Sequence, residues 1–202
     1  KWEVTLEKEE IATKDYNSFS FSVLGISDHT GATPNNLKLN SKEFRKDAVI
    51  ASVRFLKKFQ EEWYGYLISC QAENKEGFTK VPFHQNLNLC IHKGKEADFL
   101  DFFARKKRKI ESENGVEFTD GEIQNIRGKT IEVISENSSK TAISILIDIS
   151  QSASDEFQRQ KEQSPKEKEF GTTRCTMTNV HIKGDSIIFD IDLREVDTDD
   201  VQ

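Results

Sequence analysis

Apolar and polar residues alternate over several short stretches of this chain. The clearest stretch is SFSFSV at residues 18–23, where Phe19, Phe21 and Val23 fall at every second position and serines separate them. Successive side chains of a β-strand point to opposite faces of a sheet, so this spacing predicts a strand with one buried face. Residues 2–6, WEVTL, show the same alternation and predict another strand.

Turn-forming residues separate further strand-like stretches along the chain. The last two predicted strands are joined through Gly184 and Asp185. The polar turn NSS at residues 137–139 is predicted to connect the two strands of an earlier hairpin. In the second strand of that hairpin, isoleucines at alternate positions are expected to line one face. The predicted strands are WYGYLISCQAE (63–73), FTKVPF (78–83), NLNLCIH (86–92), KTIEVISE (129–136), KTAISILIDIS (140–150) and two within 172–197.

Two longer segments have apolar residues at helical spacing. The first runs from about Ser41 to Gln60 and follows a capping-box pattern, although the β-branched residues of VIASVRFLKKF make a strand its competitor. The second runs from Lys95 to about Glu113. The connector at residues 115–128 is predicted to contain a helical turn that begins at Thr119.

These elements predict an α+β fold with a mostly antiparallel sheet of about eight strands and two longer helices. We expect a single domain over residues 1–202. A polar stretch at 151–171 is almost free of apolar residues and predicts a mobile excursion, and the chain closes with the acidic sequence DTDD.

Composition places the chain among globular proteins. Fourteen phenylalanines and two tryptophans provide large surfaces to bury, within 35% hydrophobic and 32% charged residues. No apolar run reaches the roughly 20 residues that span a bilayer, and the N-terminal sequence has no signal-peptide hydrophobic region. Three widely spaced cysteines predict buried free thiols. We therefore expect an intracellular, cytoplasmic protein without a membrane partner, or a nuclear one in a eukaryote.

Charge is unevenly distributed between the two halves of the chain. Residues 1–110 contain 19 Lys and Arg against 15 Asp and Glu, whereas residues 111–202 contain 10 against 20, which gives the net charge of −6. A basic surface on the first half is thus compatible with an acidic partner, while the second half would repel one.

Candidate catalytic residues are few. The sequence contains no phosphate-binding glycine loop, no Gly-x-Ser-x-Gly motif and no His-Glu-x-x-His motif. Asp190 and Asp192 would leave the same face of one strand, and Asp148 is predicted on a neighbouring strand. Three carboxylates on one sheet face could bind Mg²⁺ for phosphoryl chemistry, but the solvent-facing side of an amphipathic strand explains the same spacing.

The basic run in FFARKKRKIE, residues 102–111, is the strongest functional signal. On a helix, Phe103 and Ile110 would face the core, while Arg105, Arg108 and Lys109 would point away and Lys106 would lie at the margin. Cations near a helix C-terminus complement the helix dipole, but one or two suffice and here there are five.

Three explanations of the basic run stay open: a solvated helix face, a contact with nucleic acid or an acidic protein, and a nuclear-import signal. The tyrosines Tyr64 and Tyr66, with Phe83, would stack on bases if they were exposed.

The sequence thus favours a non-catalytic binding module without a cofactor. Its contact residues would be Arg105, Lys106, Arg108 and Lys109, with nucleic acid as the leading partner. The alternatives are a Mg²⁺-dependent nuclease or phosphodiesterase that uses Asp148, Asp190 and Asp192, and a subunit of a protein complex that makes no nucleic-acid contact.

Overall fold

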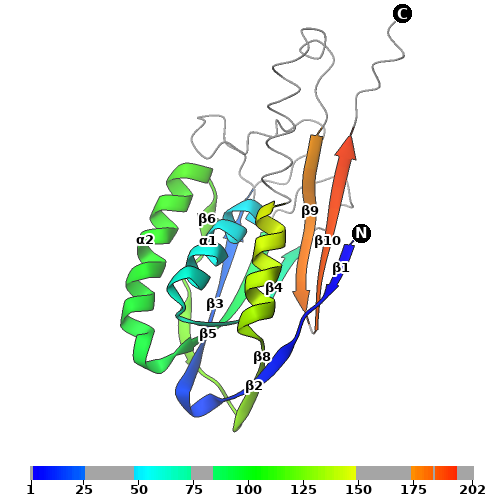
Figure 1. Ribbon diagram of the computed structural model, residues 1–202. Helices are drawn as coiled ribbons and strands as arrows, with labels where there is room; N and C mark the ends of the chain where they lie inside the picture. The colour runs from blue at the N-terminus through cyan, green and yellow to red at the C-terminus, as the bar shows by residue number, and fades with distance from the viewer. Residues whose placement is uncertain (1, 26–47, 74–83, 149–173, 184, 195–202) are drawn as a thin grey trace, which may run out of the picture.

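A computed structural model describes residues 2–25, 48–73, 84–148, 174–183 and 185–194 of the chain. The described residues form an α+β fold in which helices cover one face of an antiparallel sheet (Figure 1). The strands are β1 (Trp2–Thr5), β2 (Lys8–Ala12), β3 (Tyr16–Leu24), β4 (Gly65–Glu73), β5 (His84–His92), β6 (Glu117–Phe118), β7 (Glu122–Asn125), β8 (Thr130–Ile134), β9 (Arg174–Lys183) and β10 (Ser186–Arg194). The helices are α1 (Ala48–Glu62), α2 (Glu96–Asn114) and residues 136–148, with 3₁₀ turns at Thr13–Asp15 and Lys93–Lys95.

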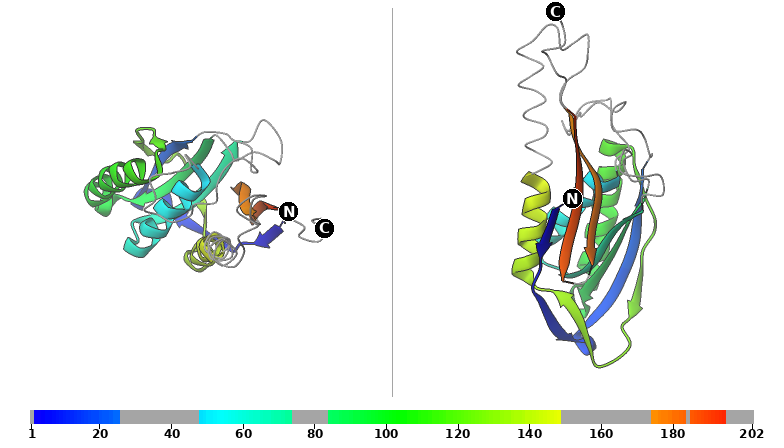
Figure 2. Two further views of the ribbon diagram at one scale, coloured as in Figure 1. Left: turned by 90° about the horizontal axis from the view of Figure 1, so that it is seen from above. Right: turned by 90° about the vertical axis from the view of Figure 1, so that its right-hand side faces the viewer.

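The main sheet has eight strands in the order β1-β10-β9-β4-β5-β3-β6, and β7 also pairs with β3. All of these pairings are antiparallel. Strands β2 and β8 form a separate two-stranded sheet at one end (Figure 1). The side view in Figure 2 shows the three helices together on one side of the main sheet. The predicted fold class is therefore confirmed.

The alternation in β3 explains how the covered face is built. Phe19, Phe21 and Val23 are buried, as predicted, and the two phenylalanine rings contact the helices. The ring centroid of Phe19 lies 4.9 Å from that of Phe103 in α2, and Phe21 lies 5.0 Å from Phe55 in α1, both edge to face. Such pairs contribute beyond the area they bury. This phenylalanine cluster fixes α1 and α2 on the sheet.

Several predicted elements agree with the structure. The stretch VIASVRFLKKF is helical in α1 rather than a strand, and the predicted strands are present as β3, β4, β5, β8, β9 and β10. The predicted helix from Lys95 corresponds to α2. The predictions for 41–47, FTKVPF, the 151–171 excursion and the acidic tail lie outside the described residues.

Two predictions are wrong. Residues 140–148 are not the second strand of a hairpin but part of the helix at 136–148. Thr119 does not begin a helical turn, because its backbone N–H donates to the carbonyl of Ser22 at 2.9 Å and its hydroxyl accepts from the N–H of Ser22 at 2.8 Å. These bonds continue the sheet beyond β6 and lead the chain into β7.

Candidate functional site

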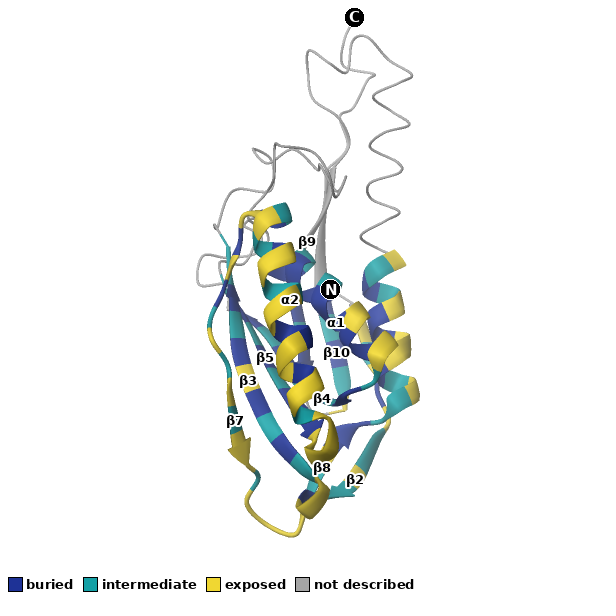
Figure 3. Cartoon of the chain, turned by 90° about the vertical axis from the view of Figure 1, so that its left-hand side faces the viewer, coloured by how far each residue is buried: buried dark blue, intermediate teal, exposed yellow. Residues whose placement is uncertain are grey.

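Helix α2 presents the predicted basic run on its outer side. Its inner side buries Phe99, Phe102, Phe103 and Ile110, and Figure 3 shows the buried and exposed faces of the helix. Gly115 ends the helix in the left-handed conformation, with φ of 61°, and its N–H donates to the carbonyl of Glu111 at 2.8 Å. A glycine at this position closes a helix without steric cost.

The five cations of α2 lie where the helical spacing predicted. Arg105, Arg108 and Lys109 are exposed, and Lys106 and Lys107 are half-buried at the margins. Charge on this side of the helix is partly compensated within the chain. Lys107 pairs with Asp120 at 2.5 Å and Lys109 lies 3.8 Å from Glu113.

The other three cations have no carboxylate at salt-bridge distance within the described part of the chain. The ammonium of Lys106 lies 5.6 Å from the ring centroid of Phe102, and the Arg108 Nε donates to the carbonyl of Ala104 in its own helix at 3.2 Å. Arg105 projects toward a shallow pocket instead. The charge of Arg105, Lys106 and Arg108 is therefore available to a partner.

This shallow pocket, of about 590 Å³, lies where the end of α1 meets the start of α2. Its lining is of mixed charge: Glu62, Tyr64, Lys95, Asp98, Asp101 and Arg105. The hydroxyl of Tyr64 donates to Glu62 Oε2 at 2.7 Å. Burial, reinforced by this hydrogen bond, raises the pKa of Tyr64 to about 12. The hydroxyl of Tyr64 is thus neutral at physiological pH and already bonded to Glu62, another residue of the pocket lining.

Trp63 occupies an unusual backbone conformation beside the pocket. Its φ of 46° lies in the left-handed region, which is costly for a residue with a large side chain. Contacts on both sides hold it: Lys95 Nζ donates to its carbonyl at 2.6 Å, and its ring lies 5.2 Å from that of Tyr66. No glycine or asparagine occupies the left-handed position at this end of α1, so its conformation could not be predicted from the sequence.

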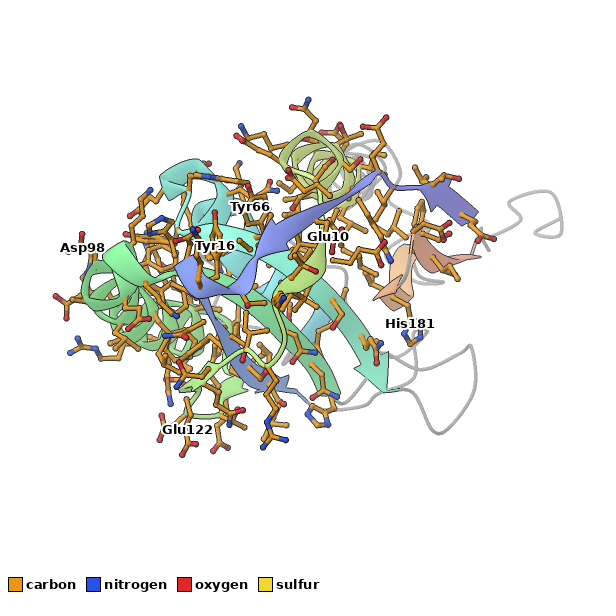
Figure 4. All side chains as sticks on the ribbon, turned by 90° about the horizontal axis from the view of Figure 1, so that it is seen from below. Glu10, Tyr16, Tyr66, Asp98, Glu122 and His181 are labelled. Carbon is orange, nitrogen blue, oxygen red and sulfur yellow. The ribbon has the colours of Figure 1, made fainter. Side chains whose placement is uncertain are left out.

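Of the aromatic residues proposed as a stacking platform, Tyr66 does not line the same surface as the basic run. Tyr64 is buried, and Phe83 lies outside the described residues. Tyr66 alternates with the core residue Leu67, so it projects from the sheet face opposite α2, next to Tyr16 at a ring distance of 5.7 Å. Figure 4 shows these two tyrosines close together and Asp98 far from them on the outside of α2.

Four strands of the main sheet supply no lysine or arginine to the face that carries Tyr66. Strands β3, β4, β5 and β7 contain neither lysine nor arginine. Phosphate contacts require such side chains, so those four strands supply none for a nucleic acid.

The three candidate aspartates do not form the predicted constellation. Asp148 is exposed on the helix at 136–148, within the helical layer, and not on a strand. Asp190 and Asp192 belong to β10, where the register with β9 shifts after Asp190. Their side chains lie outside the described part, but a sheet face shared with Asp148 is ruled out by its helix. Among the described residues there is also no group of three or more His, Cys, Asp or Glu arranged to hold a metal ion.

The described cysteines are buried, as predicted. Cys70 and Cys90 are free thiols, and burial raises the pKa of each to about 12. A thiol in this state is a poor nucleophile at neutral pH. Also among the described residues, none of the helices is long and apolar enough to cross a membrane.

Comparisons with known proteins show what this fold is similar to. Neither a protein-family model nor a curated protein matches the chain. Among solved structures, 98% of the chain superposes on aminoacylhistidine dipeptidase from Vibrio alginolyticus with a TM-score of 0.69 and 10% identity. A hydantoinase/carbamoylase family amidase from Burkholderia multivorans matches over 63% of the chain with a TM-score of 0.38 and 13% identity.

The chain spans only part of these proteins, 37% of the dipeptidase and 29% of the amidase. The fold therefore resembles a portion of the dipeptidase. At this identity the resemblance concerns the fold alone.

Proposed function

We propose that this chain is a non-catalytic binding domain and that the basic part of α2 is its contact surface for an acidic partner. The observation that carries the proposal is that Arg105, Lys106 and Arg108 present charge outward without a carboxylate partner in the described part of the chain. The contact set is Arg105, Lys106, Arg108 and Lys109.

An acidic protein surface is favoured over nucleic acid, the leading partner from the sequence. The basic run shares the outer side of α2 with Asp98 and Asp101, which repel phosphates, and Tyr66 lies on the opposite face of the sheet. A nucleic-acid groove typically combines a continuous basic surface with stacking rings. A protein partner accommodates alternating charge, because its own charges can alternate as well.

Charge reversal tests the proposal. Binding of the chain to an acidic peptide, such as oligoglutamate, and to single- and double-stranded DNA and RNA is measured by fluorescence anisotropy at low and moderate salt. The double variant Arg105→Glu with Arg108→Glu is expected to weaken peptide binding on the order of tenfold, since each arginine contact is charge-assisted. Tighter binding of nucleic acid than of the peptide would instead restore nucleic acid as the partner.

A matched control carries the same change of charge elsewhere. Lys57 on α1 and Arg127 before β8 are exposed, so Lys57→Glu with Arg127→Glu alters the net charge equally but leaves α2 intact. An equal loss of binding in both double variants would show that only net charge matters and would contradict a contact surface on α2.

We further propose that the chain serves as one domain of a larger hydrolase similar to aminoacylhistidine dipeptidase, with the hydrolytic groups outside this fold. The fold similarity over 98% of the chain supports this. The purified chain is then expected not to hydrolyse aminoacyl-histidine dipeptides, with or without divalent cations. Turnover by the chain itself would contradict a non-catalytic domain. Mg²⁺-dependent nucleic-acid cleavage abolished by Asp190→Asn would point to the nuclease alternative.

A further inference from the structure

The shallow pocket between the end of α1 and the start of α2 contains three charges that its own lining leaves without a partner. They belong to Asp98, Asp101 and Arg105, which are exposed and form no salt bridge with another described residue. Asp101 and Arg105 are four residues apart on one helix, the spacing at which such a pair normally forms. Their charges are therefore available to a bound molecule.

The other polar groups of the pocket are fixed by bonds within the chain. Tyr64 is only 8% exposed and its hydroxyl is bonded to Glu62, while the ammonium of Lys95 is bonded to the carbonyl of Trp63. Among the described residues, Trp63 is the one non-glycine residue with a positive φ. Strained backbone of this kind is concentrated at ligand sites, and a fixed wall lowers the entropy cost of binding. The pocket thus combines a fixed wall with three available charges.

The three charges lie in a definite order along one side of α2. Asp98, Asp101 and Arg105 are separated by three and four residues, which places them above one another on the same face of the helix. At about 1.5 Å of rise per residue, the guanidinium position lies roughly 6 Å along the axis from the nearer aspartate and roughly 10 Å from the farther one. The order along the helix is thus carboxylate, carboxylate, cation.

We propose that this pocket binds a free basic α-amino acid of the lysine type. Its carboxylate would contact Arg105, its α-ammonium Asp101, and its side-chain ammonium Asp98. An α-amino acid carries its carboxylate and ammonium on one carbon, which suits two opposite charges on adjacent turns. The four-carbon side chain of lysine carries the second ammonium farther along the helix. Two cations and one carboxylate in the ligand thus match two carboxylates and one cation in the pocket.

The charge pattern also defines which amino acids the pocket disfavours. A neutral amino acid makes the contacts to Asp101 and Arg105 but leaves Asp98 without a partner, and an acidic one brings a second carboxylate against Asp98. Exposed charge pairs contribute little individually, so the dissociation constant for lysine is expected to be on the order of 1 mM and to rise with salt. The site goes beyond the proposed function, because its ligand is a small molecule, and only Arg105 belongs to both.

Titration of the isotope-labelled chain with free amino acids, followed by NMR at low salt, tests the site. L-Lysine is expected to shift the resonances at the start of α2 and to saturate. L-Alanine should shift the same resonances with an affinity about tenfold lower, since it lacks one charged contact. Cadaverine, which is lysine without its carboxylate, should also bind about tenfold more weakly. L-Glutamate should give no saturable shift.

Two substitutions separate the contacts within the pocket. Asp98→Asn is expected to reduce the affinity for lysine to that for alanine and to leave alanine binding unchanged. Arg105→Gln should weaken both ligands about tenfold, because both use their carboxylate there. Arg127→Gln and Glu3→Gln are the matched controls, since they remove the same charges from exposed positions outside α2, and they should leave both affinities unchanged.

Several results would overturn the inference. They are an absence of saturable shifts up to about 50 mM lysine, equal affinity for lysine and glutamate, and an equal loss of lysine and alanine binding in Asp98→Asn. Shifts confined to residues outside the pocket would do the same. If lysine does not bind, yet the Arg105 and Arg108 double variant loses binding to the acidic peptide, the proposed function stands without this inference.

Discussion

The two faces of the main sheet differ in the side chains they carry and in how those side chains interact. The helix-covered face is built from phenylalanine rings and aliphatic side chains, as at Phe19 and Phe21, whereas the opposite face carries serine and asparagine. On that second face side chains bond laterally, since Ser22 Oγ donates to Asn86 Oδ1 and Asn88 Nδ2 to Ser69 Oγ, both at 2.7 Å. The apolar core therefore lies between the sheet and the helices. The cations of α2 without a carboxylate partner in the described part of the chain lie on the outer side of the same helical layer.

The largest effect is expected from removal of a ring on the covered face. Phe103 meets the rings of Phe19, Phe21 and Phe55, so Phe103→Ala should lower the free energy of unfolding by roughly 3–5 kcal/mol. Urea denaturation followed by circular dichroism measures the change. A loss below about 1 kcal/mol would show that the cluster does not hold α2 on the sheet.

A smaller loss is expected where atoms are added between two paired strands. A Cβ at Gly65 would lie 1.9 Å from the carbonyl oxygen of Cys90, so Gly65→Ala requires the backbone to shift and should cost roughly 1–3 kcal/mol. At Gly94 the nearest atom is 3.2 Å away on the side chain of His92, which can move. Equal thermal unfolding of Gly65→Ala and Gly94→Ala would contradict the close packing of β4 on β5.

Substitutions on the opposite face should cost less. Asn88→Ala removes the hydrogen bond to Ser69 and is expected to lower stability by about 0.5–1.5 kcal/mol. Ser20 is exposed on the same face, so Ser20→Ala should change stability by less than about 0.5 kcal/mol. If Ser20→Ala were as costly as Phe103→Ala, the contrast between the faces would not hold.

Alkaline pH should lower the stability of the fold through one tyrosine on each side of the sheet, Tyr64 and Tyr66. Burial raises the pKa of Tyr64 and Tyr66 to about 12 from an ordinary value of 10.0. Because the folded pKa exceeds the unfolded one, this contribution to stability is complete below pH 10 and is lost as pH rises from 10 toward 12. Tyrosinate absorbance and denaturation curves at these pH values measure it, and Tyr66→Phe should reduce the loss. Titration of Tyr66 at its ordinary pKa would contradict its burial.

The elements with one dominant pattern were predictable from the sequence. In β3 the strict alternation of phenylalanine and serine leaves a single choice of buried face, and in α2 the apolar residues recur at helical spacing. The exposed positions of Arg105, Arg108 and Lys109 followed from that spacing. These predictions needed only local information.

The helix at 136–148 was mispredicted because its sequence carries two patterns at once. Isoleucines at alternate positions suit a strand, but Ser139, Ala142, Ile143 and Leu146, the residues the structure buries, recur at helical spacing. Ser135 begins the helix, since its hydroxyl accepts from the N–H of Ser138 at 3.3 Å and its carbonyl from the N–H of Ser139. The predicted polar turn at residues 137–139 is therefore part of the first helical turn, which Ser135 caps, and Asp148 consequently lies on a helix.

The mixed-charge pocket could not be predicted, because its residues come from the end of α1 and the start of α2. Glu62 and Lys95 are separated by two strands in the sequence, and only the packing of the two helices brings them together.

Trp63 is placed to serve as an intrinsic fluorescence probe of the fold. Its indole contacts Tyr66 on β4 and lies beneath the ammonium of Lys140 at 5.6 Å, from the helix at 136–148, while its carbonyl is bound by Lys95 before α2. The chain has one other tryptophan, Trp2, and Trp2→Phe leaves Trp63 as the sole indole fluorophore. The emission of Trp63 then reports whether β4, the helix at 136–148 and the start of α2 are packed together.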